Sequence, residues 1–296
     1  MILIAGPTAS GKSGLALRIA AATGATIVNA DSMQVYDVLR VLTARPSPQE
    51  EAQAPHVLYG HVDPATAYST GAWLRDVAKV MAERRPQPLV FVGGTGLYFE
   101  ALTAGLSRMP DVPQAIRDGW RQRLAAEGAP ALHALLGGRD REAAARLRPQ
   151  DGQRIVRALE VLDASGRSIL SWQEERSAPL VDAGAARRFV LSPPRPVLGR
   201  NIAARLAAML ETGALAEVHA LRALCLNPQS PVMKAIGVPE LGACLDGTIT
   251  REAAVEATIH ATRRYAKRQE TWMRNRFDDG WQRFASADAI AETLGV

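Results

Sequence analysis

Residues 6–13 read GPTASGKS and directly follow the apolar run ILIA at 2–5. These eight residues satisfy the pattern G-x-x-x-x-G-K-[ST], and an Ala/Leu-rich segment at about 12–23 continues from them. A buried strand that passes through a glycine-rich loop into a helix is typical of a parallel α/β sheet. The start of the chain therefore constrains its fold more than any other feature.

The residue types in this loop suit phosphate binding. Gly6 and Gly11 let the backbone curl so that N–H groups converge on an anion, and Lys12 supplies a positive charge. Ser13 can offer its hydroxyl to Mg²⁺, and the helix that begins here directs its positive end at the anion. We expect the whole loop to bind phosphate: Gly6, Pro7, Thr8, Ala9, Ser10, Gly11, Lys12 and Ser13.

Further strands are predicted at 26–30, 89–92 and 189–192, and 70–85 has helical periodicity. Between about 110 and 186 the chain consists of arginine-rich amphipathic helices with no strand candidate. We expect an α/β fold, a parallel sheet of the P-loop type flanked by helices, with this block as an all-α insertion domain. Helices packed on the sheet are the alternative. The predicted parts are 1–110 for the first part of the core, 111–186 for the insertion, and 187–296 for the second part with a basic C-terminal helix.

Positive charge is concentrated near the C-terminus. Residues 263–276 hold six cationic side chains and one acidic one. The net charge of this segment is therefore +5, the same as the formal net charge of the whole chain. Tyr265 and Trp272 are interleaved with these cations. The pattern favours a nucleic-acid site, although a solvated helix whose cations favour its own dipole is the alternative.

Composition and the two cysteines exclude other classes. An apolar fraction of 47% without a bilayer-length apolar run indicates an ordinary globular protein with no membrane contact. The short apolar stretch before the glycine motif does not match a secretory signal, so we expect a cytoplasmic protein. Cys225 and Cys244 lack metal-ligand spacing and are expected to lie in the core.

A second candidate for chemistry is Asp31, which follows the predicted strand at 26–30. A motor or GTPase would need an acidic residue at the end of another strand, but the strand at 89–92 ends in Gly93-Gly94-Thr95. Open sheets bind ligands at the carboxyl ends of their strands, so Asp31 should face the loop across one crevice. It could bind Mg²⁺, accept a proton or cap a helix. We favour proton abstraction, because residues 32–36 carry groups suited to contacting a base.

Six blocks in series resemble the tRNA dimethylallyltransferase family, also called the IPP transferase family, over essentially the whole chain. They are GPTASGKS at 6–13, DSMQVY at 31–36, GGTGLYFEAL at 93–102, RIVRALEV at 154–161, KAIGVPEL at 234–241 and RRYAKRQETW at 263–272. The resemblance implies an enzyme that transfers the dimethylallyl group of dimethylallyl diphosphate to N6 of adenosine 37, beside the anticodon of tRNAs that read codons beginning with U. The base must leave the stack to react.

The resemblance also implies roles for individual residues. The loop would bind the donor diphosphate with Mg²⁺, Asp31 would be the general base, and Thr95 would contact the adenosine. Contacts to the tRNA anticodon stem-loop are implied for Asp31, Ser32, Met33, Gln34, Thr95, Arg117, Gln153, Arg154, Ile155, Val156, Arg157, Lys234, Arg264, Lys267 and Arg268. Arg154 and Arg157 share a helix face, where an ion pair to Glu160 is the structural alternative.

Some positions depart from the family pattern. Asn201 stands where arginine is usual, which leaves open whether Arg200, Arg205 or the C-terminal helix reaches the diphosphate. HVLYG at 56–60 and VPE at 238–240 also differ from the family. Two other functions share the loop, an ATP-dependent small-molecule kinase and a non-catalytic RNA-binding protein. We expect a monomer.

Overall fold

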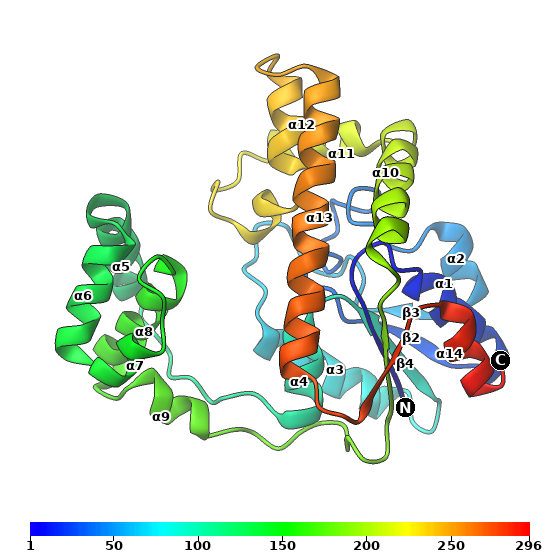
Figure 1. Ribbon diagram of the computed structural model, residues 1–296, viewed down its shortest axis with the longest axis horizontal. Helices are drawn as coiled ribbons and strands as arrows, with labels where there is room; N and C mark the ends of the chain where they lie inside the picture. The colour runs from blue at the N-terminus through cyan, green and yellow to red at the C-terminus, as the bar shows by residue number, and fades with distance from the viewer. The chain divides into compact units, whose positions relative to one another are not determined.

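A computed structural model describes all of residues 1–296, which divide into two compact units (Figure 1). The first unit comprises Met1–Thr103 and Leu180–Val296, and the second is Ala104–Pro179. The second unit thus begins and ends earlier than the 111–186 expected from the sequence. One reason is that the backbone N–H groups of Leu180 and Val181 both donate to the carbonyl of Leu102, at 3.1 Å each, so the returning chain joins the first unit there.

The first unit is built on one sheet of six parallel strands, in the order β3-β2-β4-β1-β5-β6. The strands are β1 (Ile2–Ala5), β2 (Thr26–Asn29), β3 (His56–Val57), β4 (Leu89–Gly93), β5 (Arg187–Leu191) and β6 (Trp281–Phe284). The parallel sheet and the strands β2, β4 and β5 confirm the sequence prediction. The edge strands β3 and β6 were not predicted, because β3 has two residues and β6 carries two exposed polar side chains in its centre.

Helices cover both faces of this sheet, because successive side chains of each strand point to opposite faces. On one face, Ile4 of β1 packs in a cluster with residues of α1 (Lys12–Thr23) and α14 (Ala287–Leu294). On the other, Leu3 packs in a cluster with α3 (Thr70–Glu83), α4 (Gly96–Ala104) and the end of α13 (Arg251–Arg276).

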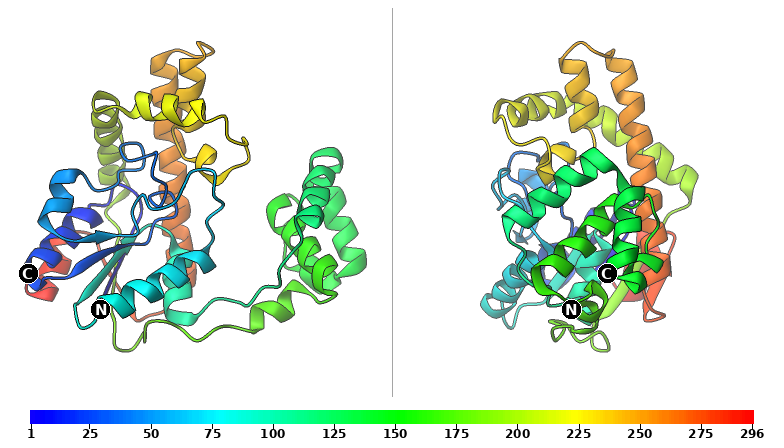
Figure 2. Two further views of the ribbon diagram at one scale, coloured as in Figure 1. Left: turned by 180° about the vertical axis from the view of Figure 1, so that it is seen from behind. Right: turned by 90° about the vertical axis from the view of Figure 1, so that its left-hand side faces the viewer.

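A further apolar cluster stands beyond the carboxyl ends of the strands. It joins the segment at 33–44 to α10 (Arg195–Glu211), α11 (Ala214–Ala223), the 3₁₀ helix η1 (Pro231–Lys234), α12 (Val238–Leu245) and the beginning of α13. The long helix α13 contacts both α10 and α12, and α12 lies beside it in both views of Figure 2. Because α13 belongs to this cluster and to a sheet face, it links the two. The short helix α2 (Pro48–Gln53) precedes β3.

The second unit is all helical. It contains α5 (Gln114–Glu127), α6 (Ala129–Arg139), α7 (Arg141–Ala145), α8 (Gly152–Ser165) and α9 (Ile169–Glu174). Its own core is formed around Trp120, Leu132 and Leu159. No β-strand lies within residues 104–179, which agrees with the expected all-α character of the block.

Two further observations concern the surface. None of the helices combines the length and the apolar content that a membrane-spanning segment needs. The expectation of two core cysteines is wrong for Cys225, which is exposed after the end of α11 with a left-handed φ of 50°. Cys244 is partly buried and packs against the cluster beyond the strand ends.

Candidate functional site

Three segments meet at the carboxyl edge of the sheet because the strands before them are neighbours. The order β2-β4-β1 places Asp31 after β2, Thr95 after β4 and the loop at 6–13 after β1. Backbone hydrogen bonds join them, from Gly6 N to Gly93 O at 3.3 Å and from Thr95 N to Ala30 O at 3.2 Å. The structure thus brings the loop and Asp31 to one edge, as the βαβ pattern predicted.

The loop has the backbone shape of an anion cradle. Ala9 and Gly11 adopt positive φ values of 63° and 92°, which turn the chain into α1. No side chain caps the N-terminus of α1, so the first N–H groups of the helix have no capping acceptor. Ser10 Oγ is buried without a hydrogen-bond partner. A bound anion would satisfy donors of this kind.

Lys12 lies within the loop. Its Nζ donates to the carbonyl of Pro7 at 3.1 Å. Burial lowers the pKa of Lys12 to about 8, the charge of Asp31 opposes this shift, and the charge of Arg205 adds to it. An anion in the loop would restore the charged form, so the ammonium is suited to a phosphate ligand.

Helix α10 contributes a second cation to the loop. Arg205 Nη2 donates to Thr8 Oγ1, and burial lowers the pKa of Arg205 while Asp31 opposes the shift. Asn201 Nδ2 donates to the carbonyl of Ala9 at 3.0 Å. Arg200 is exposed and faces a different groove. Of the arginines on α10 that the sequence left open, Arg205 contacts the loop.

The Asp31 carboxylate is held by its own backbone neighbours. Oδ1 accepts from the N–H of Met33 at 3.0 Å, and the buried Asn29 side chain accepts from the N–H of Asp31 at 2.8 Å. Asn29 Nδ2 donates to the carbonyls of Asp31 and Leu58 at 3.0 and 2.9 Å. One carboxylate oxygen is thereby engaged, while Oδ2 has no hydrogen-bond partner among the contacts of the chain.

Thr95 supports the wall beside Asp31. Its Oγ1 accepts from the N–H of Ser32 at 2.9 Å and lies 3.3 Å from Ser32 Oγ. Ser32 lines the cavity described next, whereas Thr95 does not. The structure therefore places Thr95 behind Ser32.

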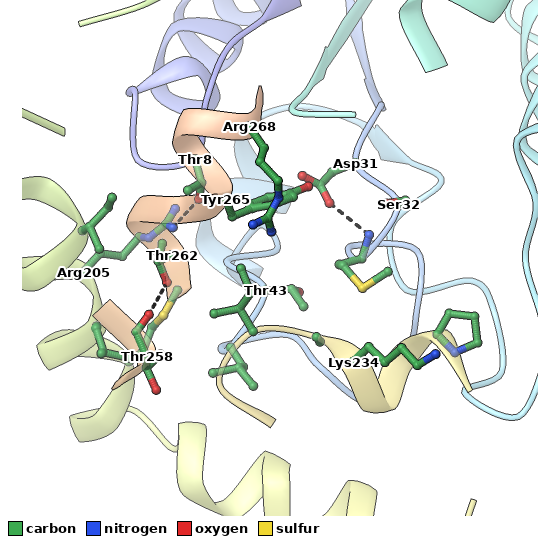
Figure 3. A pocket seen from close by; sticks show the side chains of 18 residues that line it. Thr8, Asp31, Ser32, Thr43, Arg205, Lys234, Thr258, Thr262, Tyr265 and Arg268 are labelled. Carbon is green, nitrogen blue, oxygen red and sulfur yellow. Dashed lines mark hydrogen bonds between the residues drawn. The ribbon is translucent and has the colours of Figure 1, made fainter. Parts of the chain in front are cut away.

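A cavity of about 280 Å³ opens between these segments. Figure 3 shows Thr8 and Arg205 on one side of it, Asp31 and Ser32 on the other, and the Tyr265 ring pointing toward the Asp31 carboxylate. Burial and the charge of Asp31 raise the pKa of Tyr265, so its hydroxyl stays neutral. The rest of the lining includes the apolar side chains Leu42, Ile202, Leu206, Met209, Pro231, Ala235 and Ile236. Polar and charged groups thus share one cavity with an apolar wall.

The cations of α13 do not form a single stripe. Arg268 lines the cavity, with its guanidinium 5.6 Å from the centre of the Tyr265 ring. Arg263 and Lys267 line a separate groove with Arg195 and Arg200 of α10. Arg264 is exposed and lines neither. The sequence showed that positive charge is concentrated here. On the helix, the cationic side chains point in several different directions.

Two other predicted tRNA contacts lie near the cavity. Lys234 of η1 is exposed at its lining, and its Nζ donates to Gln229 Oε1 at 2.8 Å. The Gln34 amide donates to the carbonyls of Thr43 and Ala44, at 2.9 and 2.8 Å. The side-chain nitrogen of Gln34 therefore binds the backbone at 43–44, and the side-chain oxygen of Gln34 is left for other contacts.

In the helical unit, the predicted residues differ in exposure. Gln153 and Arg154 are exposed at the start of α8, and Arg117 of α5 is partly buried. Arg157 forms an ion pair with the buried Glu160 at 3.2 Å, the alternative noted from the sequence. Arg154 Nε lies 3.5 Å from Asp151 Oδ2. Gln153 and Arg154 present the more accessible polar surface.

The prediction for Ile155 and Val156 needs correction. Ile155 is 0% and Val156 6% exposed, and both belong to the core of the helical unit. Helical periodicity explains this, because residues between two outward-facing arginines point inward. Their side chains are core residues and present no surface to RNA.

The donor set suits Mg²⁺ in one respect. Mg²⁺ usually binds through one or two carboxylates together with substrate phosphates and water, and a Ser or Thr hydroxyl directly after the lysine of such a loop is a further ligand. Ser13 is exposed in the first turn of α1, where its hydroxyl is such a ligand, and no cluster of three His, Cys, Asp or Glu forms a self-sufficient metal site. Ser13 borders a small separate cavity beside Glu50 and His56.

Sequence reasoning overlooked several residues of the site. Gln269, which contacts the loop, lies in the block RRYAKRQETW, where an uncharged amide among cations gives no signal of a role. The apolar wall from α10 was also missed, because Ile202, Leu206 and Met209 look like ordinary core positions. Separations of four residues from Ile202 to Leu206 and three from Leu206 to Met209 place them on one helix face, but do not show what that face contacts.

Comparisons with known proteins agree with this geometry. A family model described as IPP transferase matches residues 34–276, and one described as isopentenyl transferase matches residues 1–59. A tRNA dimethylallyltransferase of Mesorhizobium japonicum is 57% identical over 99% of this chain and 92% of that protein. One from Rhizobium meliloti is 53% identical over 98% and 96%.

Solved structures are similar as well. A tRNA isopentenylpyrophosphate transferase from Bacillus halodurans has a TM-score of 0.69 and 28% identity, over 99% of this chain and 95% of that one. A eukaryotic dimethylallyltransferase acting on tRNA has a TM-score of 0.76 and 26% identity, over 92% of this chain and 69% of that one. The sheet and the helical unit are therefore shared with proteins of one named activity.

Proposed function

This chain belongs to the IPP transferase family, and from that premise we propose that it transfers the dimethylallyl group of dimethylallyl diphosphate to N6 of adenosine 37 in tRNAs that read codons beginning with U. The observation that carries the proposal is the shared cavity, which Thr8 of the phosphate-type loop and Asp31 line from opposite sides, beside an apolar wall. A tRNA substrate agrees with the cytoplasmic location expected from the sequence. We also propose that the protein acts as a monomer.

The loop side of the cavity would hold the donor diphosphate. The open N–H groups at the start of α1, Lys12 and Arg205 supply hydrogen bonds and positive charge for the diphosphate as it leaves. Arg268 adds a cation at the lining of the same cavity. The apolar side chains of α10 suit the dimethylallyl group, which cannot form hydrogen bonds.

Mg²⁺, which the residues of the loop fit, would add positive charge to the diphosphate when bound, with Ser13 as the protein ligand. Substrate phosphates and water would supply further ligands to this ion.

The opposite side would hold the flipped adenine. As the bond from N6 to the allylic carbon forms, the bond from that carbon to the diphosphate oxygen breaks, and N6 loses a proton. Asp31 is the base for this proton, because its Oδ1 is fixed by the N–H of Met33 and its Oδ2 is left for the substrate. Ser32, which Thr95 supports, and the Tyr265 ring would border the base.

The helical unit would bind the anticodon stem. Gln153 and Arg154 present exposed polar groups at the N-terminus of α8, and such groups serve phosphate contacts in RNA recognition. Lys234, Arg264 and Lys267 of the first unit are exposed cations with the same potential.

The test uses purified protein, an anticodon stem-loop RNA, dimethylallyl diphosphate and Mg²⁺, without ATP. We expect adenosine to gain the mass of one dimethylallyl group with turnover. Phosphorylation of a small molecule that requires ATP would instead support a kinase. RNA binding without any mass gain would support a non-catalytic RNA-binding protein and would refute the proposed transfer.

A further inference from the structure

A single buried side chain joins two of the segments that meet at the carboxyl edge of the sheet. Gln269 of α13 is 5% exposed. Its Oε1 accepts from the N–H of Thr8 at 2.9 Å, and its Nε2 donates to the carbonyl of Gly94 at 3.0 Å. One amide therefore connects the loop after β1 to the segment after β4. Its orientation is unambiguous, because one partner is a donor and the other an acceptor.

The connection lies beside the proposed base. A Cβ built on Gly94 would lie 2.0 Å from Gln269 Nε2 and 3.4 Å from Asp31 Oδ2. A glycine at 94 is thus needed for the amide to approach the backbone, and the approach takes place next to the carboxylate. Tyr265, one turn earlier on α13, completes the arrangement, since its ring points toward the Asp31 carboxylate (Figure 3).

The bond to Thr8 also defines the shape of the loop. Thr8 N–H is one of the loop donors, and Gln269 engages it from outside the loop. Diphosphate must then be held by the other loop N–H groups with Lys12 and Arg205. An apolar side chain at 269 could fill the same space but would leave the Thr8 N–H and the Gly94 carbonyl without these partners.

We propose that Gln269 is a positioning residue that sets the distance between the diphosphate loop and Asp31. This inference rests on the proposed transfer reaction. Transfer requires the allylic carbon to lie in line between the departing oxygen and N6, and displacement by about 1 Å can cost about 10²-fold in rate. Because Gln269 contacts the loop at Thr8 and the backbone beside Asp31 at Gly94, its loss lets the loop and Asp31 move independently while each still binds its own ligand.

The test compares Gln269→Met and Gln269→Glu with the unaltered protein. Methionine has a similar length and removes both hydrogen bonds. Glutamate keeps an acceptor for Thr8, loses the donor to Gly94 and adds a negative charge, whose effect on the bound anion is measured by the dissociation constant for diphosphate. Single-turnover transfer is measured with RNA and donor saturating, and dissociation constants are measured separately for the RNA and for inorganic diphosphate with Mg²⁺. We expect Gln269→Met to transfer about 10²-fold more slowly, with both dissociation constants within about fivefold of the original.

Arg283→Met is the matched control. Arg283 Nη2 donates to the carbonyl of Met273 at 3.0 Å, so this change also removes one attachment of α13, but outside the cavity. We expect its melting temperature to fall while its single-turnover rate stays unchanged. If Gln269→Met does not fold, Gln269→Glu carries the test, with a rate loss of at least tenfold expected.

Two results would overturn the inference. One is an unchanged single-turnover rate in a folded Gln269 variant. The other is a rate loss that the Arg283 control shares, which would assign the effect to stability. An unaltered protein that transfers no dimethylallyl group would instead refute the proposed function, so the two failures are distinguishable.

Discussion

The indole of Trp272 lies directly on Gly96, where a Cβ would come within 2.0 Å of Trp272 Cε3. With Gln269 on Gly94, this contact shows that α13 packs on the backbone of the segment GGTG, which only glycine permits. The segment GGTG at 93–96 and the block at 263–272 on α13 therefore form the two sides of one interface, although they lie far apart in the sequence.

Gly96→Ala should destabilise the first unit. The added methyl group has to displace an indole ring, and overpacking of this kind costs about 1–3 kcal/mol. Urea unfolding followed by circular dichroism measures the change. Gly119→Ala is the control, because nothing lies within 4 Å of its Cβ position and alanine favours the helix. Equal stability of both variants would contradict the packing described here.

Asp31→Asn should abolish most of the transfer while RNA binding is retained. Loss of a general base lowers rates by about 10²–10⁴-fold, and asparagine keeps an acceptor for the Met33 N–H. The measurement is single-turnover transfer alongside an RNA binding assay. Asp37→Asn, an exposed acid in the same segment, should behave like the unaltered protein. Full activity of Asp31→Asn would rule out proton abstraction by Asp31.

Arg205→Met should weaken diphosphate binding. The side chain donates to Thr8 within the loop, and hydrogen bonds to charged groups contribute about 1.5–3 kcal/mol, or roughly 10- to 150-fold in affinity. Calorimetric titration with Mg²⁺ and diphosphate measures the effect. Arg200→Met, which changes an exposed arginine of the same helix, should leave the dissociation constant within about twofold. The opposite ranking would assign the diphosphate contact to Arg200.

Diphosphate affinity should depend on pH through Lys12. Burial lowers the pKa of Lys12 to about 8, so its ammonium is charged below pH 8 and becomes neutral above it. Affinity should therefore be highest below pH 8 and decrease as the pH rises through that value. In Lys12→Arg the cation persists at high pH, so the decrease between pH 7 and 9 should be smaller. The same pH profile in both proteins would exclude Lys12 as its source.

Substitutions of Arg154 and Arg157 should have different effects on RNA binding and on stability, although the two residues are one turn apart. Arg154→Ala removes an exposed cation, so RNA binding should weaken and its salt dependence should become shallower. Arg157→Ala also leaves the buried Glu160 without its partner, so it should lower stability by about 1 kcal/mol, a value reduced by partial solvent access. Thermal unfolding and RNA titration at several salt concentrations separate the two effects.

The sequence by itself determined the local structure around the loop. GPTASGKS after ILIA, the apolar runs at 26–29 and 89–93, and the separate helical block follow from residue type and period alone, since each depends on neighbours in the chain. Asp31 could be expected near the loop for the same reason, because strands in a parallel sheet end at one edge. Six blocks in series indicated the family.

Only the tertiary structure decided which distant side chains complete the site. Arg205 from α10 and Gln269 from α13 reach the loop from more than 190 positions away, and nothing local to Thr8 specifies them. The direction of each cation on α13 and the burial of Ile155 and Val156 likewise depend on what each helix packs against. The hydrophobic pattern of the sequence shows that a helix has an apolar and a polar face. How the helix packs against the rest of the molecule determines which face becomes part of a site.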